Sequence, residues 1–229
     1  VDDLQLNGLR IIQNPCAFRF GMDAVLLASF TRLRPHDRVA DMGTGTGILS
    51  LLLSQQEPTA SFEAVELQAD MADMAARSVR LNGLEDRICV RQADMRMAYE
   101  IIGRESMDAA VCNPPYGKRG GTLPSDRDGV NLSRHEASLT IREASKACAA
   151  VLRTHGRLSM VFPAARMLEL CDALRESRLE PKRARMVCAK ISRPPYLLLL
   201  EAMKNAKPGL LWLPPLVAYE DLEPRSSML

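Results

Sequence analysis

The stretch "RVADMGTGTG", residues 38–47, joins an apolar run of strand character to three alternating glycines. Residues 46–56 follow with helical character, so the stretch predicts a strand, a tight loop and a helix. Glycine allows positive φ and a close approach of backbone to a ligand, and the first N–H groups of a helix are unpaired. A plain turn would rarely need three alternating glycines. We therefore interpret it as a ligand-binding loop that contains Asp41, Gly43, Gly45 and Gly47.

Strands and helices are predicted to alternate outward from this loop. The strands are expected at 38–42, 61–66, 87–92, 107–112 and 157–162, with a closing pair at 184–191 and 196–203. The helices are expected at 46–56, 68–83, 140–154 and 164–178. Thr140 and Glu143 form a capping-box pattern that opens the third helix, and Gly156 is expected to end it. This order predicts a mostly parallel seven-stranded α/β sheet with helices on both faces.

The domain organisation is expected to be simple. A length of 229 residues suits one α/β domain, and neither a linker nor an internal repeat divides the chain. We expect a single domain over 1–229. Residues 1–37 would form a small N-terminal cap over the C-terminal edge of the sheet, 38–204 the core, and 205–229 an irregular C-terminal extension.

Composition excludes several classes of protein. No apolar run approaches the roughly 20 residues that span a bilayer, so no membrane segment is expected. The six cysteines form no CxxC pair and the three histidines show no ligand spacing, which argues against a metal site. Free thiols favour a reducing, cytoplasmic location. The net charge of +2 neither requires nor excludes a nucleic acid partner.

The residues around the glycine loop indicate which ligand it binds. Ile48 stands where a dinucleotide fingerprint would have its third glycine, and no GK[ST] follows, so neither phosphate-binding motif fits. Glu66 ends the second strand, where a carboxylate could bind ribose hydroxyls. Asp94 follows the third strand, where it could bind an adenine amino group. This set suits an adenosine without a pyrophosphate, which indicates S-adenosyl-L-methionine as the cofactor.

The stretch "NPPY", residues 113–116, follows the fourth strand, at the edge where such folds bind ligands. An exocyclic amine is a poor nucleophile because its lone pair is delocalised, so it needs orientation and hydrogen-bond acceptors. Asn113 offers a side-chain carbonyl and Pro114 a backbone carbonyl that Pro115 helps to fix, while Tyr116 offers a face for a flipped base. The simpler reading is a strand-ending turn. The related "RPPY" at 193–196 lacks the amide and precedes a strand, so we interpret it as a structural hairpin connection.

Together these motifs resemble the class I (Rossmann-like) S-adenosylmethionine-dependent methyltransferases, and among them the amino methyltransferases that carry [DNS]PP[YF]. The segments "FRFGMDAVLLASF" (18–30) and "ARMVCAKISRPPYLLLLEAMKNAKPGL" with "PPL" (214–216) resemble the bacterial tRNA1(Val) (adenine-37-N6)-methyltransferase family. The resemblance implies that residues 1–37 cover the cofactor. It also implies further cofactor-binding residues, namely Phe20, Asp23, Thr44, Leu67 and Met95.

The expected activity is methylation of adenine N6 in tRNA, with adenine 37 of tRNA-Val implied by the resemblance alone. DNA enzymes usually add a recognition domain and glutamine enzymes an N-terminal helical domain, and this chain has little room for either. Two alternatives stay open. One is an NPPY methyltransferase acting on release-factor glutamine or on rRNA guanine N2. The other is a non-catalytic RNA-binding module that has kept the fold.

Basic residues near these motifs are candidate contacts for RNA phosphates, although a solvated surface explains them equally well. Lys118 and Arg119 follow NPPY, and Arg183 and Arg185 belong to a basic run at 178–193. An anticodon loop suits recognition through splayed, single-stranded bases. No obligate protein partner is inferred.

Overall fold

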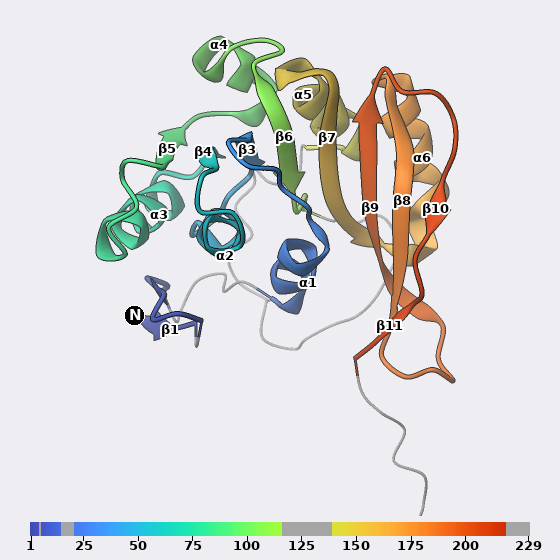
Figure 1. Ribbon diagram of the computed structural model, residues 1–229, viewed down its shortest axis with the longest axis horizontal. Helices are drawn as coiled ribbons and strands as arrows, with labels where there is room; N and C mark the ends of the chain where they lie inside the picture. Colours follow the sequence, from blue (N-terminus) through green and yellow to red (C-terminus); the bar gives the residue numbers. More distant parts are fainter. Residues whose placement is uncertain (5, 15–20, 116–138, 219–229) are drawn as a thin grey trace, which may run out of the picture.

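The fold is known from a computed structural model that describes residues 1–4, 6–14, 21–115 and 139–218 (Figure 1). Its centre is one sheet with the strand order β10-β8-β9-β7-β6-β3-β4-β5, and β11 also pairs with β8. The parallel core consists of β3 (Arg38–Met42), β4 (Ser61–Glu66), β5 (Ile88–Gln92), β6 (Met107–Cys112) and β7 (Leu152–Pro163). β9 (Pro195–Lys204) is antiparallel to both β7 and β8 (Leu179–Cys188). The predicted mostly parallel α/β sheet is thus confirmed.

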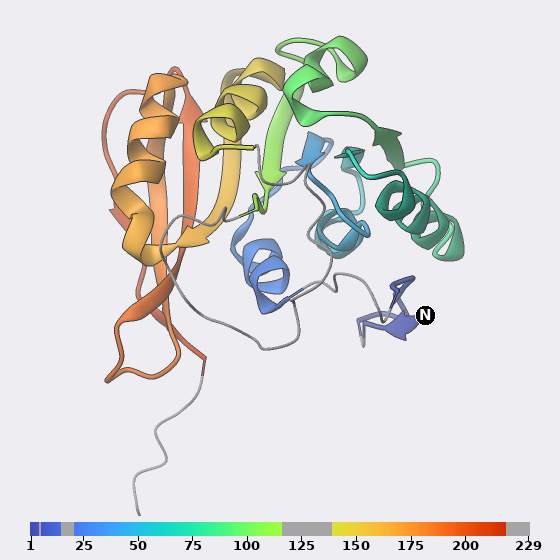
Figure 2. The same ribbon diagram turned by 180° about the vertical axis from the view of Figure 1, so that it is seen from behind.

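Helices cover both faces of the sheet, as predicted (Figures 1 and 2). One face packs against α1 (Met22–Phe30), α2 (Ile48–Gln56) and α3 (Ala69–Leu81). The other packs against η1 (Met95–Met97), α4 (Ala98–Ile102), α5 (Ile141–Val151) and α6 (Met167–Glu176), with η3 (Ala164–Arg166) leading into α6. Ala109 and Val111 of β6 point into the first cluster, and Ala110 and Cys112 into the second. Because both faces are covered, the strands are nearly continuous apolar runs.

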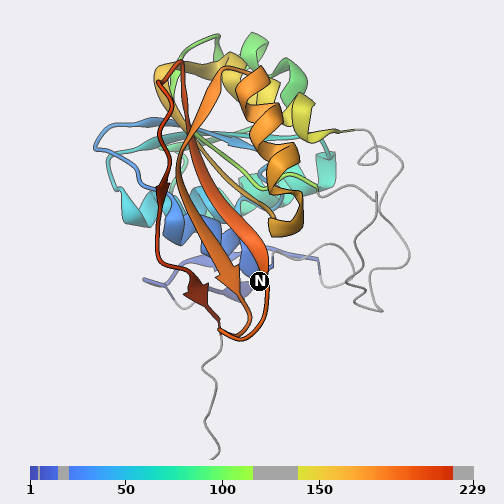
Figure 3. The same cartoon turned by 90° about the vertical axis from the view of Figure 1, so that its right-hand side faces the viewer.

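The sheet has nine strands among the described residues, so the predicted count of seven is wrong. The additional strands are β10 (Leu211–Trp212) and β11 (Leu216–Val217), which pair in parallel with β8, as Figure 3 shows. The described part of the extension is therefore not simply irregular. Each added strand has only two residues, too few for an alternating pattern to be visible in the sequence.

The boundary between α5 and β7 also differs from the prediction. The capping box is present, since Glu143 N donates to Thr140 Oγ1 over 3.2 Å and Thr140 N to Glu143 Oε2 over 2.8 Å. The helix nevertheless ends at Val151, and Gly156 lies inside β7. A Cβ at Gly156 would lie 2.8 Å from the carbonyl oxygen of Arg153. The glycine is therefore needed for a close backbone approach in an irregular strand.

The described N-terminal residues pack along a face of the molecule. β1 (Asp2–Asp3) and β2 (Arg10–Ile11) form a small antiparallel pair, and Ile12 N donates to Ser78 Oγ of α3 over 2.9 Å. α1 lies in the helical layer beside α2, with Leu27 fully buried. The predicted cap over the C-terminal edge is therefore wrong for α1. Cofactor covering by residues 1–37 stays a prediction, because residues 15–20 lie outside the described part.

Two expected absences can be compared with the described residues. None of their helices is long and apolar enough to cross a membrane. In the same part of the chain, His, Cys, Asp and Glu side chains form no group of three that could hold a metal ion.

Candidate functional site

The site lies where the strand order reverses. The chain passes from β3 outward to β4 and β5, and then returns to β6 on the other side of β3. The C-terminal ends of β3 and β6 are therefore neighbours with diverging connections, the place where open α/β sheets bind ligands. The glycine loop leaves β3 at this edge, and Asn113 leaves β6 at the same edge, which faces down in Figure 1. The two motifs are thus brought together by the topology.

The glycine loop has the conformation that its sequence predicts. Gly43 has φ 80°, and a Cβ added there would lie 3.0 Å from Met95 Cε. Gly47, with φ 89°, is the residue that caps the N-terminus of α2. Both positions favour glycine because other residues are strained at such φ values. Gly43 N and Thr44 N both donate to the carbonyl of Val65, so β4 holds the loop close to the end of β3.

Glu66 ends β4 beside this loop, with only 7% of the residue exposed. Its Oε2 accepts a hydrogen bond from Gly45 N and its Oε1 from Gln68 N, both over 2.9 Å. Each carboxylate oxygen has a second lone pair and can still accept a hydrogen bond from a hydroxyl group. Leu67, the next residue, is 44% exposed. Glu66 and Leu67 therefore place a carboxylate and an apolar side chain next to each other at the end of β4.

Asp41 lies beneath the glycine loop and is fully buried. Its Oδ2 accepts from Thr44 Oγ1 over 2.6 Å and from Ser50 Oγ over 2.7 Å, while its Oδ1 has no partner among the described residues. Burial raises the pKa of Asp41 to about 6, against the opposing effect of these hydrogen bonds. The residue ties the loop to α2. Sequence reasoning missed Ser50, because a serine in an apolar helix gives no signal until the strand beside it is placed.

Asp94 is held by a partner that the sequence did not indicate. It caps η1, accepting from Arg96 N over 2.9 Å, and forms an ion pair with the Arg96 side chain. The hydrogen bonds from Arg96 lower the pKa of Asp94. Met95, which lies between these two residues in the sequence, is 9% exposed, and its methyl group lies against Gly43 of the glycine loop. An adenine amino group at Asp94 would share the carboxylate with Arg96.

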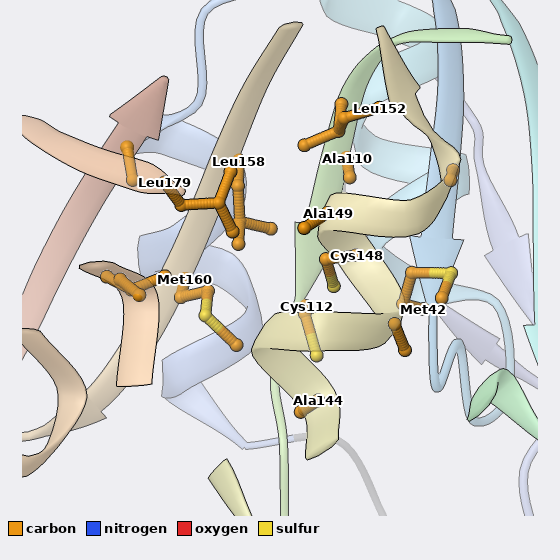
Figure 4. Close-up of a cluster of buried hydrophobic side chains, with 14 of the residues drawn as sticks. Met42, Ala110, Cys112, Ala144, Cys148, Ala149, Leu152, Leu158, Met160 and Leu179 are labelled. Atoms are coloured by element: carbon orange, nitrogen blue, oxygen red, sulfur yellow. The ribbon is translucent and has the colours of Figure 1, made fainter. Parts of the chain in front are cut away.

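Asn113 is half-buried at the end of β6, followed by buried Pro114 and exposed Pro115. The preceding residue, Cys112, lies beside α5 in the same buried cluster as Cys148 (Figure 4). A hydrogen bond with Cys148 and complete burial raise the pKa of Cys112 well above its ordinary value. A thiol of this kind is unreactive, so this pair serves as packed support beneath the Asn113 segment.

Several predicted site residues lie outside the described part of the chain, namely Phe20, Tyr116, Lys118 and Arg119. Asp23 is described, and it is a half-buried residue in the first turn of α1. The structure thus brings together the glycine loop, Glu66, Leu67, Met95 and Asp94 at one end of the edge, with Asn113 and Pro114 beside them.

The prediction that Arg183 contacts RNA is wrong. The residue is only 6% exposed, and its Nη2 donates to Glu201 Oε2 over 2.9 Å and to the carbonyl of Phe30 over 2.8 Å. Its guanidinium lies 4.2 Å from the centroid of the Phe30 ring. Arg183 therefore joins β8 to α1. Arg185 lies farther along the same strand and is half-buried, so its contact with RNA stays a prediction.

The interpretation of "RPPY" as a hairpin connection is confirmed. Arg193 N donates to the carbonyl of Lys190 over 3.0 Å within the turn between β8 and β9, and Pro195 begins β9. Residues 190–195 are all exposed.

Comparison with known proteins agrees with this arrangement. The family model of the methyltransferase small domain matches residues 19–178. The chain is 30% identical over 208 residues to a tRNA1(Val) (adenine(37)-N6)-methyltransferase of Parabacteroides distasonis, covering 89% of this chain and 85% of the relative. It is 32% identical to the protein of the same name from Tolumonas auensis, covering 81% of each.

Solved structures show the same fold. A predicted O-methyltransferase from Agrobacterium tumefaciens superposes with a TM-score of 0.72 at 22% identity, covering 88% of this chain and 90% of the other. A geranyl diphosphate methyltransferase in complex with SAM superposes with a TM-score of 0.55 at 15% identity, covering 80% and 84%. The sheet order, the glycine loop at its reversal point and the family match lead to one conclusion: the chain has the Rossmann-like class I methyltransferase fold and belongs to the methyltransferase small domain family.

Proposed function

We propose that the protein is an S-adenosyl-L-methionine-dependent methyltransferase that modifies adenine N6 in tRNA, at adenine 37 of tRNA1(Val). The observation that carries the proposal is the position of Asn113 and Pro114 at the end of β6, beside the glycine loop at the end of β3. We infer the tRNA substrate from the names of the relatives, which state this reaction. We take residues 1–229 as one domain with its catalytic core at 38–204.

The residues around the glycine loop fit the cofactor. A Cβ at Gly43 would press against the Met95 methyl group at 3.0 Å, and Glu66 is a carboxylate fixed by two backbone N–H groups. Glu66 would hold the ribose hydroxyls and Asp94 the adenine amino group, with Leu67 and Met95 against the base. Phe20 and Asp23 would cover the site from the N-terminal segment. When bound, the cofactor supplies a sulfonium methyl group that is already activated for transfer.

The chain's own part in the reaction is to orient the amine. The Asn113 side-chain carbonyl and the Pro114 backbone carbonyl accept hydrogen bonds from the adenine N6 amine and direct its lone pair. Such positioning and stabilisation of developing charge carry the catalysis. Tyr116 would stack on the flipped base, and Pro115 would stiffen the turn. No strong general base is needed, because the proton can leave after transfer.

Two other functions make different predictions. A methyltransferase of release-factor glutamine or rRNA guanine N2 would use the same residues on another substrate. A non-catalytic RNA-binding module would need neither the glycine loop nor Asn113. The names of the relatives favour tRNA over both. A tRNA substrate implies action in the cytoplasm.

The test is methyl transfer from labelled S-adenosylmethionine to tRNA, followed by nucleoside analysis by mass spectrometry. We expect N6-methyladenosine in a tRNA1(Val) transcript and none when guanosine replaces adenosine 37. Label in a release factor or in rRNA, with none in tRNA, would replace the substrate but keep the mechanism. A protein that neither binds the cofactor nor transfers label would be the binding module.

A further inference from the structure

A recess lies on the face of the sheet opposite α1, α2 and α3. This cleft, of about 450 Å³, runs between α5 and the η1–α4 segment. Its polar and aromatic lining consists of Arg96, Tyr99, Arg104, Glu143 and Lys146. Three of these side chains are cations and only Glu143 is an anion. None of them belongs to the catalytic or cofactor-binding set above.

The positive charge in the cleft is only partly compensated. Arg96 is shared between Asp94 and Glu143, with 3.6 Å between Arg96 Nη1 and Glu143 Oε1. Arg104 lies over the Tyr99 ring at 3.7 Å, a contact that fixes the guanidinium without neutralising it. Lys146 has no ion-pair partner among the described residues, and both Lys146 and Arg104 are exposed. Cations held at a recess without counter-charge favour an anionic ligand.

The cleft begins at the catalytic edge of the sheet. Arg96 lies just beyond the C-terminal end of β5, and Glu143 is in the first turn of α5. From Glu143 to Ala150 the helix rises about 10 Å. An extended anion lying along α5 could therefore start beside the cofactor-binding residues and reach Lys146 and Arg104 in succession.

We propose that this cleft binds the phosphodiester backbone of the substrate RNA, with Arg104 and Lys146 as phosphate contacts. The inference rests on the proposed function, because it takes tRNA as the substrate. An open cleft with exposed cations suits a polyanion that passes across the surface. The Arg104–Tyr99 pair adds a planar cationic surface of the kind on which ribose and bases also pack.

The experiment measures tRNA binding by the full chain at several salt concentrations. Arg104→Glu with Lys146→Glu should raise the Kd for tRNA at least tenfold. It should also reduce the magnitude of the slope of log K against log salt by about 1.4 to 1.8, since each of the two lost phosphate contacts removes about 0.7 to 0.9. Affinity for S-adenosylmethionine should stay within about twofold. Lys146→Arg should retain tRNA affinity, and a circular dichroism melt should show that each variant is folded.

The matched control is Arg10→Glu with Arg80→Glu, which changes the charge equally at two exposed residues near α3, on the other side of the sheet. If the control weakens tRNA binding as much as the cleft variant, the effect is only net charge and the inference is overturned. If the wild-type protein methylates tRNA and the cleft variant binds it normally, the cleft inference alone fails. If the wild type neither binds nor methylates tRNA, the proposed function fails and the cleft inference with it.

Discussion

The sequence Pro-Pro-Tyr occurs twice in this chain, and the two Pro-Pro pairs lie in opposite settings. The pair after Asn113 follows a buried parallel strand at the point where the strand order reverses. The pair after Arg193 lies in an exposed turn and leads into β9, an antiparallel strand. Both Pro-Pro pairs lie at the same edge of the sheet, and the hairpin between β8 and β9 extends past it in Figure 1. The comparison teaches that the position on the sheet and the preceding residue, rather than the shared tripeptide, distinguish the proposed catalytic segment from the hairpin connection.

Removing the first amide should give the largest effect. Asn113→Ala deletes the proposed acceptor for the amine, which should lower kcat by about 100- to 1000-fold, the usual cost of losing one such polar contact to the transition state. The Kd for S-adenosylmethionine should stay within about twofold. Single-turnover methylation and calorimetric titration would measure the two quantities. Turnover close to the wild-type rate would make the two segments equivalent turns and overturn the comparison.

The glycine loop beside the first Pro-Pro pair rests on buried Asp41, whose raised pKa can be tested through the pH dependence of stability. Its folded pKa of about 6 exceeds the ordinary value of 3.8, so the protonated form is favoured in the fold. The stabilisation is full below pH 3.8 and is lost as the pH rises through 6, at a cost of about 3 kcal/mol.

Asp41→Asn removes this titration. Its free energy of unfolding, relative to that of the wild type, should therefore rise between pH 4 and pH 7. Chemical denaturation of both proteins at the two pH values measures the change. A constant difference between the proteins would show that Asp41 ionises normally beneath the loop.

A substitution among the proposed cofactor-binding residues beside the first Pro-Pro pair should have a smaller effect, and on cofactor affinity rather than on turnover. Glu66→Gln removes the negative charge that we propose holds the ribose hydroxyls, and a hydrogen bond to a charged group is worth about 1.5 to 3 kcal/mol. We expect the Kd for S-adenosylmethionine to rise by about tenfold or more, with kcat at saturating cofactor nearly unchanged. Glu63→Gln, on the same strand but paired with Arg91, is the control. Equal effects at both positions would remove Glu66 from the cofactor site.

The second Pro-Pro pair should tolerate the substitution that makes the two segments most alike. Arg193→Asn should leave kcat unchanged and should alter the Kd for tRNA by no more than about threefold, because one exposed cation is lost. Added to Asn113→Ala, it should restore no activity. Methylation assays of the single and double variants would measure this. Any restored turnover would show that the amide acts independently of its position.

Much of this arrangement was predictable from the sequence, because strong local patterns carried it. Buried parallel strands such as 107–112 are bounded apolar runs, and the glycine loop needs a backbone that few other residues adopt. Contacts between distant segments were not predictable. Arg183 looked like part of a basic surface until α1 was placed over it. The local pair of Arg96 and Asp94 was missed for another reason, because it depends on the geometry of a short 3-10 turn.

The two short C-terminal strands have a consequence for the behaviour of the protein in solution. β8 has ten residues, and an uncovered edge of that length is a template for pairing with another chain. Leu213 N and Ala218 N donate to the carbonyls of Ala184 and Cys188, so the chain's own end occupies this edge. The opposite edge, β5, has only five residues and carries Arg91. Because residues 211–217 pair with β8, they should keep its edge from pairing with another molecule. We therefore expect a variant truncated after residue 204 to self-associate, which light scattering would detect.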